Sequence, residues 1–549
     1  MNKAKRFFLF FLTLFLLVSC RFSGGESASE PGSVEPVSSE SSELPTSYPK
    51  DEEGFLVLPE KDYAYPLSTE RQSRIRYAQF VDQPSSSLRL YQEGEEIPLY
   101  KVHTNASQTW TPNDYVLAEN SVGIIEKEGP VTLVLSTNFA LTYGATIRPL
   151  SKNVPYSVDK EKRLIVFTIV DCGQYTIEFR PNRTLHLFVD PLGQYEKEGG
   201  ETLYFGEGLH NRENDSRINS AHQVILSSNQ TVFIDYGAVV QASFVANGAE
   251  NVRIVGGGVV SGAVFERDAE KNTQQIPFDF NFCKNLRIEG VSCLDPAGWA
   301  YNVYFCQDVE IVGVKVISSR SNGDGISLQS CQDVRVSDSF IRTWDDSLVV
   351  KNYPEWSDRS KQGTTRNILF ERCLVWTDLA QSMEIGYETV GQVMDNIRFD
   401  QITVLHSYHK AAISIHNGNN AAITNVRYSN IVIEDASMGR GDGSDTLIEI
   451  TCEFSSTWST KQGITELGSV SDVVLENIEV LSGRDRLKVS LRGSMDTRSG
   501  YGNSLHYVDR VEFRNVRIMG EELDGDYPYL SCNEYVREVR FVRETGAVR

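Results

Sequence analysis

Basic residues are scarce in this chain relative to acidic ones. The 549 residues include 53 lysines and arginines against 74 aspartates and glutamates, a formal net charge of −21. Such a charge repels the phosphate backbone of nucleic acids, so no nucleic-acid partner is expected. It also disfavours a polyanionic substrate, unless a cleft carries basic residues of its own.

Long apolar runs are missing beyond the first twenty residues. The one short run, residues 7–18, follows a basic stretch at residues 3–6. It is too short for a comfortable membrane span and has the order of a bacterial export signal. Residues 17–20 resemble a lipoprotein lipobox, so residues 1–20 are predicted to be a signal peptide with Cys20 as the lipidation site. A plain secretory signal is the alternative.

Large apolar residues are almost absent from residues 21–53, which are rich in serine, glutamate and proline. Such a segment cannot bury enough surface to fold, so it is predicted to be a disordered linker. The chain is therefore expected on the extracellular face of a bacterial membrane. We expect a monomer that meets the membrane only through its lipid anchor.

Helical periodicity of useful length is absent from the rest of the chain. Within residues 54–190, alternating apolar runs at 131–135, 164–170 and 175–179 are separated by turn residues. This pattern predicts an antiparallel β-sandwich domain. The fold class is therefore all-β in this part.

Residues 191–549 repeat a short unit: Asn or Asp, an aliphatic residue, any residue, then an apolar one. The units begin at Asn251, Asn285, Asp308, Asp333, Asn367, Asn396, Asn425 and Asp472. The shortest steps, 23 and 25 residues, approximate one bare coil. Short strands at a regular period that cannot bury a face alone indicate a solenoid, and a parallel β-helix fits best.

Paired CxxC motifs of the zinc-binding kind are lacking among the nine cysteines. Cys283, Cys306 and Cys331 each precede a repeat unit by two residues, which predicts a ladder on one face. Neighbouring parallel strands give poor disulfide geometry, so we interpret the ladder as small buried side chains. A disulfide or a metal site is the alternative.

Three carboxylates stand out in the repeats. Asp324, within Asn322-Gly-Asp-Gly, precedes the pair Asp345-Asp346 by about one coil, 21 residues. Residues one period apart in a solenoid lie side by side, so these side chains should converge on one patch. Clustered carboxylates split their pKa values, as acid/base chemistry on a glycosidic bond requires. Asp turn residues without catalytic function are the alternative.

These segments, with residues 206–210, 228–234, 254–262 and 295–300, resemble the right-handed β-helix glycoside hydrolases. That clan contains the polygalacturonases (family 28) and the dextranases with isopullulanase (family 49). The resemblance covers most of residues 200–520, and a β-sandwich before the helix is more similar to the dextranase side. It implies a right-handed parallel β-helix.

The resemblance also implies roles for the carboxylates. Asp345 matches the general acid, and Asp324 and Asp346 match the residues that hold and deprotonate the attacking water. It implies inversion of configuration, with no metal and no organic cofactor.

Two departures bear on the substrate. Gln381 stands where polygalacturonases have a histidine, and residues 414–417, Ser-Ile-His-Asn, replace the Arg-Ile-Lys that pairs with a galacturonate carboxylate. Arg and Lys suit such a carboxylate, so a neutral glucan is favoured. A polygalacturonase or pectin-type hydrolase is the alternative if Lys351, Lys410 or His416 supplies the charge.

Residues expected to bind the sugar lie in or near the motif coils. They are Asn322, Trp299, Trp344, Lys351, Glu384, Tyr387 and His416, with Trp376 as a further aromatic candidate. The sugar, the linkage, and endo or exo attack depend on loops 264–280, 352–365 and 436–468.

We therefore expect a surface-anchored inverting glycoside hydrolase that acts on a polysaccharide. Two other classes stay open. One is a non-catalytic glycan-binding β-helix protein, against which the intact aspartate trio argues. The other is a polysaccharide lyase, which would need a basic cluster that the motif coils lack apart from Lys351 and Arg342.

Overall fold

The computed structural model describes residues 48–543, apart from gaps at 65–73, 108, 111–112, 181, 196, 198–199, 201–202, 356, 359, 441–442 and 460–465. The predicted signal peptide, Cys20 and most of the predicted linker lie outside the described residues. Residues 46–549 form one compact unit. Within the described part of the chain, no helix is long and apolar enough to cross a membrane.

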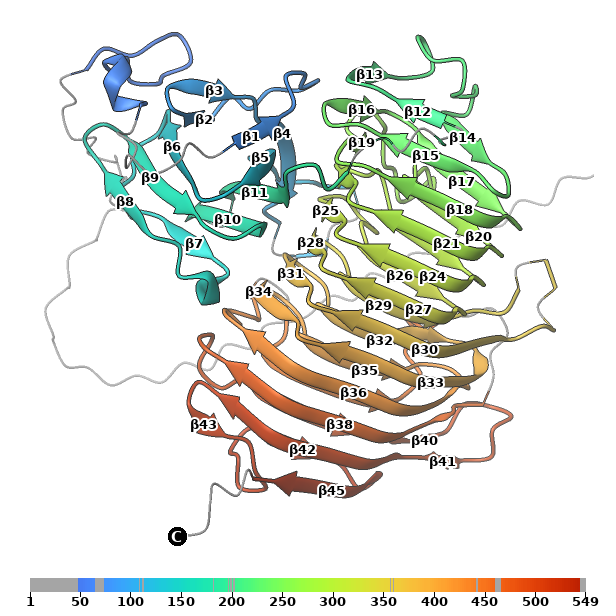
Figure 1. Cartoon of the computed structure of the whole chain (residues 1–549). Helices are drawn as coiled ribbons and strands as arrows, with labels where there is room; N and C mark the ends of the chain where they lie inside the picture. The colour runs from blue at the N-terminus through green and yellow to red at the C-terminus, as the bar shows by residue number, and fades with distance from the viewer. Residues whose placement is uncertain are drawn as a thin grey trace, which may run out of the picture. The chain divides into compact units, whose positions relative to one another are not determined.

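The N-terminal part is a β-sandwich (Figure 1). One sheet contains β1 (Arg74–Tyr77), β4 (Tyr100–Asn105), β5 (Leu117–Glu128), β7 (Thr146–Arg148), β10 (Gly173–Arg180) and β11 (Arg183–Pro191). The other contains β2 (Leu88–Gln92), β3 (Glu95–Ile97), β6 (Val131–Thr137), β8 (Tyr156–Asp159) and β9 (Leu164–Ile169). Two 3-10 turns, η1 (Glu60–Asp62) and η2 (Leu150–Lys152), complete it. The prediction of a purely antiparallel sandwich is wrong at one pair, because β5 and β11 run parallel.

The rest of the described chain is a parallel β-helix whose coils follow one another from green to red in Figure 1. The first strand of each coil belongs to the set β12 (Leu203–Phe205), β15 (Thr231–Ile234), β18 (Glu250–Val255), β21 (Lys284–Glu289), β24 (Gln307–Val312), β27 (Gln332–Ser337), β30 (Gly363–Glu371), β33 (Gly391–Asp400), β36 (Ala422–Ile433), β38 (Ser469–Val480), β42 (Val508–Ile518) and β45 (Val536–Val542). A short second strand follows in β13 (Gly208–His210), β16 (Ala238–Val240), β19 (Val259–Ser261), β22 (Ser292–Leu294), β25 (Lys315–Ile317), β28 (Phe340–Thr343), β31 (Leu374–Thr377) and β34 (Thr403–Ser407), and β43 (Glu521–Glu522) pairs with β42.

The third strands form a separate sheet of eleven. They are β14 (Gln223–Leu226), β17 (Ser243–Asn247), β20 (Phe278–Asn281), β23 (Tyr301–Tyr304), β26 (Ile326–Gln329), β29 (Leu348–Asn352), β32 (Met383–Thr389), β35 (Ile413–Asn417), β37 (Thr446–Cys452), β39 (Lys488–Arg492) and β44 (Leu530–Cys532). A hairpin of β40 (Ser494–Asp496) and β41 (Ser504–His506) lies outside both sheets.

The Asn or Asp that opens each repeat unit adopts a left-handed backbone conformation, with φ between 54° and 57° at all eight predicted positions. Asn and Asp tolerate this region better than other non-glycine residues. The aliphatic residue that follows is in register from coil to coil, as in Leu286, Val309 and Val334, and is buried in the solenoid core. The predicted repeat is confirmed, and its polar residue is explained by backbone geometry.

The predicted cysteine ladder is present. Cys283, Cys306 and Cys331 are buried, and the backbone N–H of Cys283 lies 3.3 Å from the sulfur of Cys306. All eight cysteines in the described chain are free thiols, which matches the interpretation as small buried side chains.

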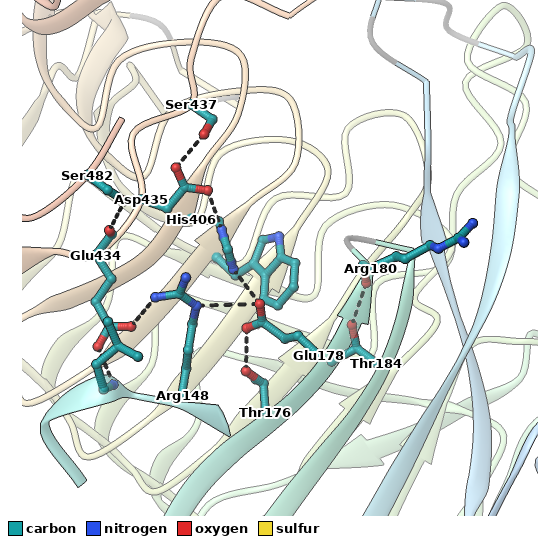
Figure 2. Close-up of polar contacts among 12 residues, drawn as sticks. Arg148, Thr176, Glu178, Arg180, Thr184, His406, Glu434, Asp435, Ser437 and Ser482 are labelled. Atoms are coloured by element: carbon teal, nitrogen blue, oxygen red, sulfur yellow. Dashed lines mark hydrogen bonds and ion pairs between the residues drawn. The ribbon is translucent and has the colours of Figure 1, made fainter. Parts of the chain in front are cut away.

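The sandwich packs against the solenoid through apolar and charged contacts. Tyr100, Val102 and Phe188 of the sandwich share one buried cluster with Phe340 and Trp376 of the solenoid. Figure 2 shows a polar group at the same interface, in which Arg148 pairs with Glu434 and Glu178 pairs with His406. Asp435 bonds to the other nitrogen of the His406 ring.

Candidate active site

A column of residues runs across four neighbouring coils just before the third strands. Tyr301, Ile326, Leu348 and Met383 are in register, and the residues two positions earlier are Trp299, Asp324, Asp346 and Gln381. Parallel strands stack at roughly 4.8 Å, so Asp324 and Asp346 are neighbours in this column. The spacing of 21 residues predicts that the trio converges, and the register places Asp346, rather than Asp345, level with Asp324.

Close backbone approach explains the glycine after Asp324. The N–H of Gly325 donates to the carbonyl of Asp346 at 2.8 Å, and a Cβ on Gly325 would lie 2.4 Å from the carbonyl oxygen of Ser347. Any larger residue would push the two aspartate-bearing turns apart. Asn322 is left-handed, with φ of 52°, and its Oδ1 accepts a 2.6 Å hydrogen bond from Arg267.

Buried hydroxyls hold the turn that carries the aspartate pair. Thr343 donates to the carbonyl of Asp345 at 2.6 Å and shares a hydrogen bond with Ser347. Ser347 bonds in turn to Thr377 at 2.7 Å. The carboxylates therefore stand on a scaffold that is fixed before substrate arrives.

The three aspartates open into one pocket of about 310 Å³. Its lining consists of Trp110, Trp299, Asn322, Asp324, Asp345, Asp346, Lys351, Ala380, Gln381, Tyr387, Glu388, Lys410, Gly443, Ser444, Glu449 and Trp458. Seven of the ten predicted site residues are in this set. The volume is at the lower end of the range for ligand pockets, about 300–1,000 Å³.

Burial dominates the electrostatics of the trio. It raises the pKa of Asp324 to about 7, with Lys351 opposing and Asp345 adding to the shift. Burial also raises the pKa of Asp345, against the positive charges of Lys351 and Lys410. The pKa of Asp346 is raised well above its usual range by burial and by the charges of the other two aspartates. Burial therefore favours the protonated form of all three carboxyl groups.

Lys351 is the buried cation of the pocket. Its Nζ lies 3.5 Å from Oδ2 of Asp324 and 3.4 Å from Oε2 of Glu388. It also lies 5.2 Å from the ring centre of Trp299, within cation–π range. Lys351 is thus engaged by carboxylates of the protein itself.

Four of the residues that were predicted to contact the sugar do not line the pocket. Trp344, Glu384 and His416 are at most 1 % exposed, and none of them lines the pocket. Their predicted role in direct contact is wrong because other side chains cover them. Trp376 lies at the sandwich interface, where the Arg342 guanidinium packs 3.7 Å from its ring centre.

Glu384 and His416 instead support the pocket wall. Glu384 bonds to Ser414 and, at 2.8 Å, to Nδ1 of His416, whose ring stacks on Tyr387 with centres 4.1 Å apart. His416 also pairs with Glu449 at 3.3 Å. Burial lowers the pKa of His416, but both glutamates outweigh it and raise the pKa to about 9.

Glu449 faces the pocket as a permanent anion. Burial would raise its pKa, but His416 and Arg492 together lower it to about 2. It occupies the same column as Glu384 and Ser414, one coil further on. Its place in the third strand of the next coil, level with Ser414 and inside residues 436–468, is the signal that could have found it.

Two pocket tryptophans were not predicted. Trp458 belongs to residues 436–468, a loop predicted to affect substrate choice, although no residue in it was predicted to bind the sugar. Trp110 belongs to the sandwich and precedes the aspartate motifs by more than 200 residues, so its place in the pocket cannot be predicted from the repeat spacing. Within the described chain, no group of three or more His, Cys, Asp or Glu side chains is arranged to hold a metal ion.

Comparison with known proteins decides the family. The model of glycosyl hydrolases family 28 matches residues 206–504. The chain belongs to glycosyl hydrolases family 28. The matched segment contains the aspartate trio and all other solenoid residues that line the pocket, so the resemblance found in the sequence is confirmed.

Curated relatives of this family 28 protein are distant. An endo-polygalacturonase of Pectobacterium carotovorum subsp. carotovorum is 24% identical over 230 residues, which cover 39% of this chain and 54% of the relative. A probable polygalacturonase of Vitis vinifera is 23% identical over 150 residues, covering 27% and 30%. The chain thus spans about half or less of the length of these relatives.

The family 28 chain also resembles the solved structure of Dex49A from Penicillium minioluteum. The TM-score is 0.50 at 13% sequence identity, and the match covers 85% of this chain and 98% of that one. This likeness supports the fold, a parallel β-helix with a domain before it.

Proposed function

We propose that this family 28 protein hydrolyses glycosidic bonds of a polysaccharide with inversion of configuration. The observation that carries the proposal is the convergence of three buried aspartates with raised pKa on one pocket. Buried carboxyl groups that keep a proton at neutral pH are what a general acid requires.

The proposed reaction uses the three carboxyl groups in two roles. Protonated Asp345 donates to the glycosidic oxygen as the bond from the anomeric carbon to that oxygen breaks. Asp324 and Asp346 hold a water on the opposite face of the sugar and accept its proton as it attacks. Burial favours the protonated form of these carboxyl groups, and the family resemblance supports Asp345 as the proton donor. An inverting site needs about 6.5–9.5 Å between acid and base to fit that water.

We propose a neutral glycan, with a glucan as the first choice, as substrate. Five carboxylates line the pocket against two lysines, and one of those lysines is paired with Asp324 and Glu388. Glu449 stays ionised across the physiological range and can accept hydrogen bonds from sugar hydroxyls. It would repel a uronate carboxylate. His416, in the segment that replaces Arg-Ile-Lys, is buried and pairs with Glu384 and Glu449 of the protein itself.

A polygalacturonate substrate is the second candidate. The similarity to the Pectobacterium endo-polygalacturonase favours it, as does Lys410, which lines the pocket with its Nζ 5.1 Å from the ring centre of Trp458. Lys410 would then be the partner of the uronate carboxylate.

Product release from a panel of glycans tests the function: dextran, pullulan, other α-glucans, polygalacturonate and rhamnogalacturonan, with wild type beside Asp345→Asn. Release from a neutral glucan that the variant lacks supports the first candidate. Release from polygalacturonate instead supports the second candidate substrate and contradicts the first. Proton NMR of the first-formed anomer checks inversion. Binding without release by either protein would leave a glycan-binding protein.

We propose in addition that the protein is a lipoprotein on the extracellular face of a bacterial membrane. The support is the order of residues 3–20, with Cys20 at the lipobox position and a Ser/Glu/Pro-rich linker after it. Cys20→Ala should release the protein from the membrane fraction. Unchanged fractionation would contradict the anchor.

A further inference from the structure

The sandwich contributes a side chain to the pocket. Trp110, on the connection from β4 to β5, lines the pocket beside the aspartates of the solenoid. Its ring stacks on Trp344 with centres 5.1 Å apart and an interplanar angle of 13°. Trp458 meets it edge to face at 5.8 Å and 87°. Trp344 directly precedes Asp345, so Trp110 is packed on the turn that carries the proposed acid.

Hydrogen bonds hold this connection on the solenoid. Asn113 donates from its amide to Asp268 at 3.3 Å and accepts from the N–H of Ala269 at 2.8 Å. Upstream, Asn105 donates to the carbonyl of Ser319 at 3.1 Å. Both contacts are made to solenoid segments next to Arg267 and Ser321. Arg267 donates hydrogen bonds to the carbonyl of Ser321 and to Oδ1 of Asn322, and so positions Asn322. Trp110 is therefore positioned before substrate binds, which reduces the entropy lost on binding.

The chemistry of the wall matches a sugar ring. An indole presents a large apolar face with little conformational freedom, and the C–H face of a pyranose is a complementary surface. Trp344 is covered by Trp110 and fully buried, so the outer ring of the stack is the one that substrate can reach. The stack also explains why Trp344 is buried, because its ring supports the ring of Trp110 from the side of the protein interior.

We propose that Trp110 is a substrate-binding residue and that the N-terminal sandwich completes the glycan site of the solenoid. The inference rests on the proposed function, since it names a further contact for the same substrate. It assigns the sandwich a part in binding a pyranose ring next to Asp345. Trp458, which packs edge to face on Trp110, lines the pocket beside it.

Steady-state kinetics of Trp110→Ala and Trp110→Phe test the inference on the best glycan of the panel. Tyr143→Ala is the matched control, because Tyr143 is a sandwich aromatic that is 79% exposed and lies outside the pocket. We expect Trp110→Ala to raise KM about tenfold or more with kcat within about threefold, and Trp110→Phe to restore much of the loss. Asn113→Ala, which keeps the ring but removes two anchoring hydrogen bonds, should raise KM by a smaller factor.

Binding measured without turnover separates the possible failures. Calorimetric titration of an oligosaccharide into Asp345→Asn, with and without Trp110→Ala, should show the same tenfold loss of affinity at an unchanged melting temperature. If wild type hydrolyses the glycan but Trp110→Ala matches Tyr143→Ala in KM and affinity, this inference alone is wrong. If wild type neither hydrolyses nor binds any glycan, the proposed function and this inference fall together.

Discussion

Nε2 of His406 in the solenoid lies 3.0 Å from Oε2 of Glu178 in the sandwich, and both residues are nearly fully buried (Figure 2). Nδ1 of the same ring lies 2.8 Å from Asp435. Nearby, Arg148 reaches from the sandwich to Glu434 at 2.7 Å and to Glu178 at 3.4 Å. Charges of both signs thus link the two parts of the molecule on the side of the solenoid where the second strands lie.

This link predicts a pH-dependent stability. Burial lowers the pKa of His406, but Glu178 and Asp435 outweigh it and raise the pKa. A raised pKa means that the stabilisation is complete below the unfolded value, about 6.5, and is lost as pH rises through the folded value. His406 holds the pKa of both carboxylates below normal despite their burial, so their contribution is lost at acid pH.

The test is thermal unfolding from pH 4 to 10 on wild type and His406→Gln. We expect the variant to lose about 3–5 kcal/mol near pH 6 and to show a weaker alkaline decline, because Glu178 and Asp435 lose their buried partner. His222→Gln, outside this interface, is the control. Equal alkaline declines in wild type and His406→Gln would contradict the assignment.

Asp345→Asn should abolish hydrolysis and leave the fold intact. The amide cannot donate a proton to the glycosidic oxygen, and loss of a general acid costs roughly 10²–10⁴ in kcat. Asp308→Asn is a matched control, because Asp308 opens a repeat unit in a left-handed conformation that Asn adopts equally well. Turnover near the wild-type rate in Asp345→Asn would end the assignment of the acid.

The pH profile of kcat/KM should fall below about pH 7, the value to which burial raises the pKa of Asp324, because a protonated Asp324 cannot accept the proton of the attacking water. Lys351 lowers the pKa of Asp324, so Lys351→Gln should raise it and move the acidic limb to higher pH. A profile that keeps its acidic limb in this variant would show that Asp324 does not act as the base. The melting temperature of Lys351→Gln must be measured alongside, since Glu388 loses its partner as well.

Gly325→Ala should cost stability and activity together. Its Cβ would meet the carbonyl of Ser347 at 2.4 Å, and overpacking of this kind costs about 1–3 kcal/mol. The two aspartate-bearing turns would also move apart, so kcat should fall. Gly200→Ala is the control, because a Cβ there meets nothing within 4 Å. Wild-type activity in Gly325→Ala would show that the spacing of the turns is not critical.

The solenoid and the aspartates of the pocket could be predicted from the repeat along the chain. The first position of each unit has a left-handed backbone that favours Asn or Asp, as at Asp333 and Asn396. The next position is buried in the core and favours an aliphatic residue, so both residue types recur along the sequence. The same period brings Asp324 and Asp346 side by side, because the register of neighbouring coils in a parallel β-helix follows from short distances along the chain.

Which other side chains line the pocket depends on packing between segments that are far apart in the sequence. His416 and Glu384 have the right period, yet they are buried, because Tyr387 stacks on His416 and the pair bond to each other. Trp110 lies outside the repeat units. It reaches the aspartates because the sandwich packs on the solenoid, and such long-range contacts depend on the complementary surfaces of two separately folded cores. No pattern along the chain encodes such a contact.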